Sequence, residues 1–235
     1  MKNIIRSFKN RVVLKPWGRE YNIFNNKKKF SITYLHIKKG FCTSLHSHSK
    51  KKTGFLILSG VAEVQLGLYT KNILRYKPMS ILVLRPGLFH RIKANKKSDL
   101  FALEIETPFI RSDLIRLQDN YGRRNKGYES INKTRQINEK DVIFKIPKKN
   151  EKNLYKLNGV NIEFNYYKNF SSFKNYDDKS VSIICDGQMV TENGKEVIST
   201  GEIVKSYTLK KLSKYYKIKN QILILKAFKS KYLHS

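Results

Sequence analysis

The sequence predicts an all-β fold, a sandwich or a closed barrel, for most of its 235 residues. Short apolar runs recur at regular intervals, several of them alternate apolar with polar residues, and Gly, Pro, Asn or Ser stand between them. Many short strands at even spacing are typical of two packed sheets or a barrel. Hydrophobic residues make up 40% of the chain, which is enough for a core and excludes wholesale disorder.

The first half of the chain contains five predicted strands, each short and each with an apolar face. They span residues 30–37, 54–58, 61–66, 80–84 and 100–106. The fourth strand ends at a Pro-Gly turn. Only residues 111–118 have the spacing of a short amphipathic helix.

The composition changes after residue 121, and we expect three parts: a domain at 1–125, a polar linker at 126–153 and a second domain at 154–235. The linker is rich in Lys and Asn and contains one predicted strand, at 142–146. Elements of the second domain repeat the order of the first. They are residues 182–187, 188–190, 201–204 and 222–226, which parallel residues 56–60, 61–64, 80–84 and 101–105.

The chain carries 48 Lys and Arg against 18 Asp and Glu, a net charge of +30. Such a surface attracts phosphate groups, whether of a nucleic acid or of a small anion. The basic residues form short runs spread along the chain, without a recognition helix or an aromatic RNA-binding pattern. This favours compositional drift, with attraction to small anionic substrates, over nucleic-acid binding.

Several sequence features bear on the compartment. No run of about 18 or more apolar residues occurs, so we expect no transmembrane helix, and the basic N-terminus lacks the apolar segment of a secretory signal. The two cysteines, Cys42 and Cys185, need no disulfide framework, and we expect both to be buried as small apolar residues. We therefore expect a cytoplasmic protein.

Three of the five histidines form a pattern. His46 and His48 are two residues apart, so on a strand both side chains point to the same face. His90 follows the turn at Pro86 and Gly87 and begins another strand. Three neutral imidazoles that converge inside a barrel form a site for Zn, Fe, Mn, Co or Ni. The alternative is chance, because a His-x-His pair is a short motif.

These spacings resemble the two motifs of the cupin superfamily. Gly40, His46, His48 and Gly60 match the first motif, and the Pro-Gly-x-x-His turn that ends at His90 matches the second. The resemblance implies a double-stranded β-helix, which is a jelly-roll-like barrel, with a divalent metal ion in its interior. Together with the repeat, it implies a bicupin whose degenerate second barrel has lost the ligands.

A closer resemblance covers residues 12–125. The Pro-Trp-Gly at 16–18 and the segment 113–123, which ends in Tyr-Gly-Arg, look like the two ends of the isomerase domain of bifunctional mannose-6-phosphate isomerase/mannose-1-phosphate guanylyltransferase. The resemblance implies a sugar isomerase or epimerase that acts on a sugar phosphate or nucleotide sugar in carbohydrate or polysaccharide biosynthesis. Two ligand positions depart from the family pattern: His46 stands in place of Gln, and Thr53 in place of Glu.

The motifs and the resemblance give the candidate site residues their roles. The metal ligands are His46, His48 and His90, the catalytic candidates are His90 and Glu104, and the substrate-binding candidates are Trp17, Arg85, Tyr121 and Arg123. Glu104 and Glu106 share one face of a strand and are the nearest acidic residues that can compensate for Thr53. The pattern does not determine whether that face points inward. A lid role for the tryptophan and a solvated surface position for each arginine are the alternatives.

Thr53 keeps two other functions open, because a site of three histidines without a carboxylate also resembles that of iron-dependent thiol dioxygenases. The first alternative is therefore a three-His iron dioxygenase-like cupin. The second is a non-catalytic bicupin that binds a sugar phosphate. The expected partner is an anionic small-molecule sugar derivative, and neither a membrane nor a nucleic acid is expected. A monomer and a homodimer both remain open.

Overall fold

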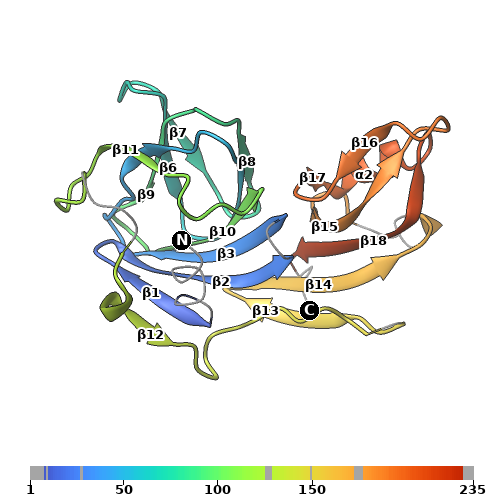
Figure 1. The fold of residues 1–235 in the computed structure, drawn as a ribbon, viewed down its shortest axis with the longest axis horizontal. Coiled ribbons are helices and arrows are strands. Elements are labelled where there is room, and N and C mark those ends of the chain that lie inside the picture. The colour runs from blue at the N-terminus through green and yellow to red at the C-terminus, as the bar shows by residue number, and fades with distance from the viewer. Residues whose placement is uncertain are drawn as a thin grey trace, which may run out of the picture. The chain divides into compact units, whose positions relative to one another are not determined.

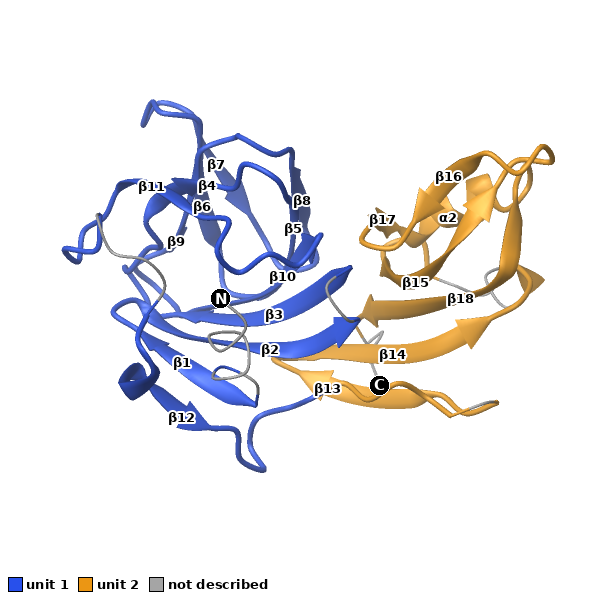
Figure 2. Cartoon of the chain, in the orientation of Figure 1, with its two compact units in different colours: residues 1–143 blue, residues 144–235 orange. Residues whose placement is uncertain are grey.

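The computed structural model describes residues 8, 10–26, 29–124, 129–148, 150–171 and 177–229. The chain divides into two compact units, residues 1–143 and 144–235 (Figure 2). Both consist almost entirely of strands, which confirms the all-β prediction (Figure 1). Among the helices formed by the described residues, none has the length and apolar character needed to cross a membrane.

The first unit contains two antiparallel sheets. The larger has the order β12-β1-β2-β3-β10-β5-β8 and the smaller the order β11-β4-β9-β6-β7. The larger sheet consists of β12 (Thr134–Gln136), β1 (Arg11–Lys15), β2 (Gly18–Asn26), β3 (Phe30–Ile37), β10 (Leu100–Thr107), β5 (Lys52–Ser59) and β8 (Ile81–Leu84). The smaller consists of β11 (Ile115–Gln118), β4 (Leu45–Ser47), β9 (His90–Ala94), β6 (Ala62–Leu66) and β7 (Ile73–Tyr76).

A shared apolar core joins the two sheets into a barrel. Phe55 and Ile57 of β5 and Leu100 of β10 belong to the same buried cluster as Val64 of β6 and Ile92 of β9. Side chains at alternate positions of a strand point to one face, so each sheet contributes one face to this core. This is the cupin arrangement that the sequence motifs predict.

The five predicted strands are present as β3, β5, β6, β8 and β10. Strand β5 is buried at six successive positions, which explains why its sequence is a continuous apolar run. The short β4 is also present, at the position where the histidine pair predicts a strand. The prediction missed β1, β2 and the exposed β7.

The predicted helix at 111–118 is wrong. Residues Ile115–Gln118 form β11, which pairs with β4 and places Arg116 opposite His46. Strand β4 pairs with β9 on one side, and β11 provides the hydrogen-bonding partner for its other edge. A tertiary pairing therefore overrides the local helical spacing.

The polar segment at 126–153 is not a simple linker. It includes η1 (Ile131–Lys133) and β12, which pairs with β1 and so belongs to the first unit. The division between the units falls between residues 143 and 144. Residues 142–146, all of them described, form no strand, contrary to the prediction.

The second unit contains one sheet with the order β13-β14-β18-β15-β16, and β17 pairs with part of β15. Its elements are β13 (Asn153–Leu157), β14 (Val160–Tyr167), β15 (Val181–Val190), β16 (Glu196–Ser199), β17 (Ile203–Lys205), α2 (Ser206–Leu212) and β18 (Lys217–Phe228). Its core includes Ile184, Met189, Ile222 and Ile224 of the sheet together with Leu209 of α2.

The strand pairing of the first unit recurs in the second. β5 pairs with β10 and β8, and β15 pairs in the same way with β18 and β17. Ile57 exchanges backbone hydrogen bonds with the turn before β8, and Ile184 does so with the turn before β17. These elements are the ones that the sequence repeat aligns.

Candidate metal centre

The three predicted ligands converge inside the first unit. His46 on β4 lies directly opposite His90 on β9, and His48 follows at the end of β4. The centroids of the rings of His46 and His90 are 4.4 Å apart, and those of His48 and His90 are 5.5 Å apart. One nitrogen from each ring lies within 4.8 Å of the other two. The predicted convergence is confirmed.

Backbone carbonyl groups orient all three rings. Each histidine places its Nδ1 within hydrogen-bonding distance of a carbonyl oxygen. The carbonyls belong to Ser44 for His46, Asp113 for His48 and Leu88 for His90, at 2.8, 2.5 and 3.0 Å. A carbonyl can only accept, so Nδ1 carries the proton and Nε2 keeps its lone pair. The Nε2 atoms of His48 and His90 are buried and have no hydrogen-bond partner among the described residues.

Burial keeps the three rings uncharged. Desolvation, with the nearby Lys51 ammonium adding to it, lowers the pKa of His48 to about 4. Desolvation also lowers the pKa of His90 to about 4, and burial together with the two neighbouring rings lowers that of His46 well below its ordinary value. Neutral imidazoles with a fixed Nδ1–H are the form that binds a metal ion, so the donor set fits a divalent transition metal.

Asp113 fixes the loop that follows the first two histidines. Its carboxylate accepts hydrogen bonds from the backbone N–H groups of Ser49, Lys50 and Lys51 and from the Ser49 hydroxyl. Burial alone would raise the pKa of Asp113, but these hydrogen bonds outweigh it and lower the pKa to about 2. Because the carbonyl of the same residue holds His48, Asp113 couples the loop to the ring orientation.

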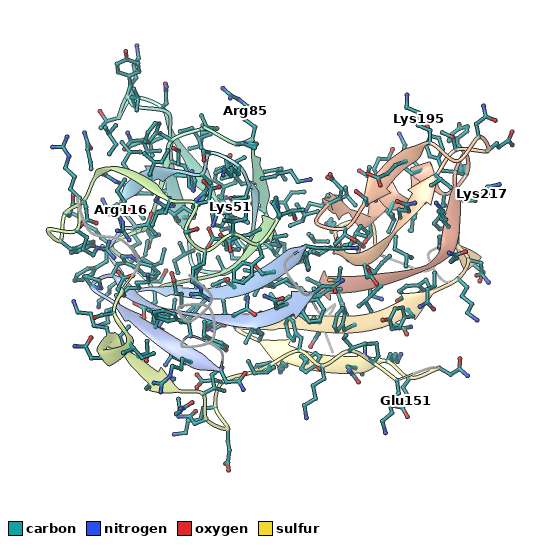
Figure 3. All side chains as sticks on the ribbon, viewed as in Figure 1. Lys51, Arg85, Arg116, Glu151, Lys195 and Lys217 are labelled. Carbon is teal, nitrogen blue, oxygen red and sulfur yellow. The ribbon has the colours of Figure 1, made fainter. Side chains whose placement is uncertain are left out.

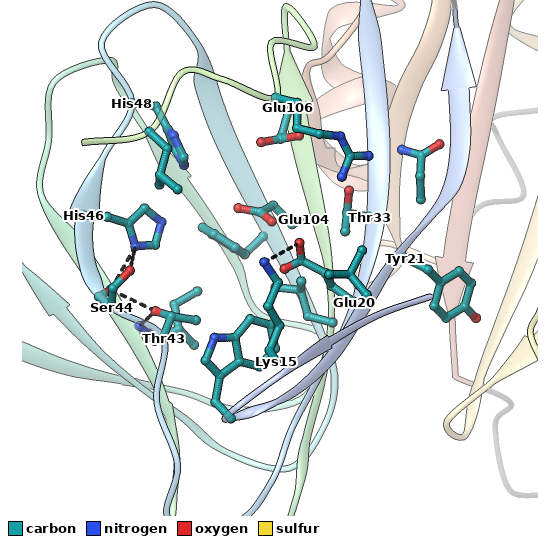
Figure 4. A pocket seen from close by; sticks show the side chains of 18 of the residues that line it. Lys15, Glu20, Tyr21, Thr33, Thr43, Ser44, His46, His48, Glu104 and Glu106 are labelled. Atoms are coloured by element: carbon teal, nitrogen blue, oxygen red, sulfur yellow. Dashed lines mark hydrogen bonds and ion pairs between the residues drawn. The ribbon is translucent and has the colours of Figure 1, made fainter. Parts of the chain in front are cut away.

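Two carboxyl groups face the histidines across the cavity (Figure 4). Glu104 and Glu106 of β10 both line the cavity, which settles the direction that the sequence left open. Their oxygens and a nitrogen of His48 lie within 4.8 Å of one another. Glu106 forms a buried ion pair with Lys51 and accepts a hydrogen bond of 3.3 Å from Ser31.

Glu104 differs from Glu106 in its protonation. Burial, reinforced by the charge of Glu106, raises the pKa of Glu104 to about 8. At neutral pH this carboxyl group therefore carries a proton and can donate a hydrogen bond or a proton into the cavity.

Basic side chains line the cavity more densely than acidic ones. The basic residues are Arg11, Lys15, Lys51, Arg111, Arg116 and Arg123, and the acidic residues are Glu20, Glu104 and Glu106. With Glu104 protonated, positive charges dominate the lining. Several of them are already paired; Lys15, for example, forms ion pairs with Glu20 and Glu129.

Two of the predicted substrate-binding residues line the cavity. Trp17 is 4% exposed, belongs to the apolar core and lines the cavity. Arg123 also lines the cavity, but it forms ion pairs of 2.7 Å with both Asp119 and Glu129. Its position in the family motif is therefore explained by an internal ion-pair network.

The other two predicted substrate-binding residues do not reach the cavity. Arg85 is exposed, is not among the lining residues and points outward (Figure 3). It stands at the end of β8, where the turn directs its side chain away from the barrel interior. Tyr121 hydrogen-bonds to the backbone of Cys42 at 3.0 Å and stacks on Phe41, which is a structural contact.

The sequence prediction missed the other cavity cations. Arg116 lies on β11, and Lys51 stands just before β5 and is 3% exposed. The alternation of Ile115, Arg116 and Leu117 is a strand signal that would have placed Arg116 on one face. No sequence signal separates Lys51 from the other lysines of its run. Cys42 and Cys185 are both free and buried, as predicted.

Comparison with known proteins confirms the resemblance of the first unit. Residues 5–119 match the family of mannose-6-phosphate isomerase C-terminal domains. Xanthan biosynthesis protein XanB of Xanthomonas campestris is 30% identical over 119 residues, which are 48% of this chain and 24% of XanB. Alginate biosynthesis protein AlgA of Pseudomonas fluorescens is 28% identical over 117 residues, which are 47% of this chain and 23% of AlgA. The chain thus spans about a quarter of the length of these relatives.

The solved structures that match this chain have low sequence identity and low TM-scores. Capsular polysaccharide assembling protein CapF from Staphylococcus aureus is 15% identical, with a TM-score of 0.40 over 46% of this chain and 34% of CapF. A cupin-2 domain from Rhodospirillum rubrum is 16% identical, with a TM-score of 0.35 over 39% of this chain and 60% of that domain.

Proposed function

We propose, from the match of the first unit to the mannose-6-phosphate isomerase C-terminal family, that this unit is a metal-dependent cupin. It binds a sugar phosphate or a nucleotide sugar and isomerises or epimerises it in polysaccharide biosynthesis. The observation that carries the proposal is the set of three converging imidazoles, two of them buried and His46 half-buried, each with Nδ1 within hydrogen-bonding distance of a carbonyl oxygen.

His46, His48 and His90 would hold the metal ion. When bound, such an ion polarises the carbonyl and hydroxyl oxygens of a sugar. Three protein ligands also leave coordination positions open for substrate oxygens or water, as catalytic sites require. The identity of the metal is not fixed by this donor set, since imidazoles suit Zn, Fe, Co, Ni and Mn.

Glu104 is the proposed acid and base of the reaction. An isomerase must move a proton between neighbouring carbons or oxygens of the sugar, and a carboxyl group with a pKa near neutrality is suited to that task. Glu104 faces the same cavity as the histidines, and its pKa is raised to about 8. In this proposal the ionised form of Glu104 removes the proton from the carbon next to the carbonyl, and the C–H electron pair forms an enediolate. The protonated Glu104 then returns this proton to the neighbouring carbon while the hydroxyl proton passes from one sugar oxygen to the other, which leaves the carboxylate ionised again.

The cavity cations support an anionic substrate. Arg11, Arg111 and Arg116 line the cavity in addition to Lys51. A phosphate accepts the two parallel hydrogen bonds that one guanidinium can donate, and a positively charged cleft raises the local concentration of anions. We assign phosphate binding to these lining arginines and not to Arg85.

The second unit is proposed to be a degenerate copy of the barrel with a structural role. Its strand pairing repeats that of the first unit, but apolar side chains fill its interior, including Leu209 of α2. Among its described residues, no group of three His, Cys, Asp or Glu side chains is arranged to hold a metal ion.

Thr53 supports a second candidate function. It occupies the position of the family's carboxylate ligand and leaves three histidines as the protein ligands on the two ligand strands. Such a triad fits an iron-dependent dioxygenase that oxidises a thiol. Oxygen consumption with Fe(II) and a small thiol would separate this candidate from an isomerase.

Metal content and turnover together test the proposal. The purified wild-type protein is expected to hold about one equivalent of metal, and His48→Ala is expected to hold none, by elemental analysis. His36→Ala is the matched control, because His36 lies on β3, pairs with Asp99 and does not line the cavity. Retention of metal by a folded His48→Ala protein contradicts the proposal.

A panel of hexose phosphates and nucleotide sugars then tests the reaction. Isomer formation from one of them, followed by proton NMR, is expected from the metal-loaded wild type and not from Glu104→Gln. If the loaded protein changes none of the panel, the enzymatic part of the proposal is wrong.

A further inference from the structure

We propose that Glu106, on the neighbouring strand β10, is the carboxylate ligand of the metal and replaces the ligand missing at position 53. This inference rests on the proposed metal site, and it concerns which strand supplies the anionic donor. Three observations carry it: the register of the two strands, the shared position of His48 and the fixed orientation of the carboxylate.

The register places Glu106 next to the vacant ligand position. Strands β5 and β10 are antiparallel neighbours, and Glu106 lies directly opposite Thr53. Side chains directly opposite in such a pair have Cβ atoms about 5 Å apart and point to the same side. A carboxylate on either strand therefore enters the same part of the barrel interior.

Thr53 leaves room for a carboxylate from β10, and position 53 is itself polar. Its side chain is 1% exposed, and its hydroxyl oxygen has no hydrogen-bond partner among the described residues. A residue of this length ends well short of where a glutamate carboxylate would reach. The unpaired hydroxyl marks a polar position that the metal-free protein does not satisfy.

His48 connects the carboxylates to the histidine triad. The ligand atoms of His46, His48 and His90 lie within 4.8 Å of one another, and so do those of His48, Glu104 and Glu106. Because the two groups share His48, an ion at the triad lies beside the carboxylates of β10.

Lys51 and Ser31 hold the Glu106 carboxylate in place. Glu106 is 7% exposed, forms an ion pair with Lys51 and accepts a hydrogen bond from the Ser31 hydroxyl. Carboxylates that bind metals are commonly held by such outer hydrogen bonds. The negative charge also offsets the repulsion between a divalent ion and the buried Lys51 ammonium.

Glu104 is the competing donor, and the structure disfavours it. It lies opposite Phe55, two residue pairs along the strand from the Thr53–Glu106 pair, and so does not face the vacant ligand position. Glu104→Gln is therefore a matched control on the same face of the same strand.

The test measures Co(II) binding to the full chain by competition with a chromophoric chelator and by the visible spectrum of bound Co(II). Glu106→Gln is expected to weaken binding by about 10- to 100-fold or more and to change the spectrum, because a ligand is lost. Glu104→Gln is expected to stay within a few-fold of the wild type. Thr53→Glu combined with Glu106→Gln is expected to recover most of the affinity, since the carboxylate returns to the facing strand.

A second variant removes the effect of an unpaired lysine. Lys51→Met combined with Glu106→Gln has no orphaned ammonium, and it is still expected to bind Co(II) weakly. Full recovery in this variant, or wild-type affinity and spectrum in Glu106→Gln, overturns the inference. If the wild type itself binds no Co(II), or binds it as well as His48→Ala does, the proposed metal site has failed instead.

Discussion

At the scale of single residues, several side chains that line the cavity have a pKa far from their value in water. The pKa of His48 and of His90 is lowered to about 4 by burial, so both rings are neutral. The pKa of Glu104 is raised to about 8, so this carboxyl group is neutral as well. The buried carboxylate of Glu106 forms an ion pair with Lys51 in the same cavity.

These protonation states predict a stability maximum for the metal-free protein near pH 6.5. As the pH falls from about 6.5 to 4, the histidines of the unfolded state take up protons, whereas those of the folded state stay neutral. The free energy of unfolding therefore decreases. From about pH 4.5 to 8 the unfolded state has lost the proton of Glu104 while the folded state keeps it, so this group lowers stability as the pH rises. Above about pH 6.5 the contribution of the histidines is complete, and the net effect is a loss. The measurement is the thermal midpoint in the presence of a chelator from about pH 4 to 9.

Glu104→Gln separates the two sides of this profile. This variant is expected to remove most of the decrease in the free energy of unfolding between about pH 6.5 and 8. After screening by cavity water, that decrease is on the order of 1 kcal/mol, which corresponds to a few degrees in the thermal midpoint. On the acidic side the rise caused by the histidines should become steeper above about pH 4.5, because the opposing contribution of Glu104 is removed there as well. Glu196→Gln, at an exposed position of β16, is the control and should leave both sides unchanged. An equal alkaline loss in wild type and Glu104→Gln would show that Glu104 is not the group responsible.

At the scale of the elements, two glycines mark equivalent corners of the two units. Gly60 follows β5 with a φ of +80°, and Gly187 lies within β15 with a φ of +84°. A Cβ atom at Gly60 would lie 2.2 Å from the carbonyl oxygen of Asp99, and one at Gly187 would lie 2.3 Å from that of Gln221. Each glycine thus lets the chain turn close against the backbone that leads into the central strand, β10 or its counterpart in β18.

Alanine at either corner is therefore expected to destabilise the protein strongly. Gly60→Ala and Gly187→Ala combine the strain of a left-handed backbone with a backbone clash, at a cost of about 3 kcal/mol or more. Gly67→Ala is the control, because Gly67 has a φ of +76° but nothing within 4 Å of an added Cβ, so only the conformational cost of about 1 kcal/mol applies. Thermal unfolding of the three variants checks the order. Equal shifts in all three would show that the close backbone approach is not needed.

At the scale of the whole molecule, the dominant property is the net charge of +30. Basic residues line the cavity as well as the exterior, so the long-range field and the cavity attract the same kind of ligand. Like charges in such excess also repel one another in the folded chain more than in the expanded one.

This repulsion predicts that salt stabilises the fold. Raising sodium chloride from about 20 to 300 mM shortens the screening length to well under about 10 Å and should raise the thermal midpoint by a few degrees. Potassium chloride should give the same shift, because screening does not depend on the identity of the cation. A midpoint that falls with salt would mean that favourable ion pairs, such as those of Arg123, outweigh the repulsion.

The sequence by itself determined the features that depend on local pattern. Period-two alternation and turn residues located the main strands, and the spacing of His46, His48 and His90 placed three imidazoles on strands of one barrel. The repeat between the two halves stays a prediction, which the pairing of β15 with β17 and β18 supports.

The tertiary structure alone decided which strands pair and which faces point inward. Residues 115–118 became a strand because β4 offered an open edge, which no local propensity encodes. Glu104 and Glu106 face the cavity, whereas Arg85 faces solvent, although all three lie at strand positions or ends. Alternation shows which residues share a face, but only the packing of one sheet against another determines which face is the interior.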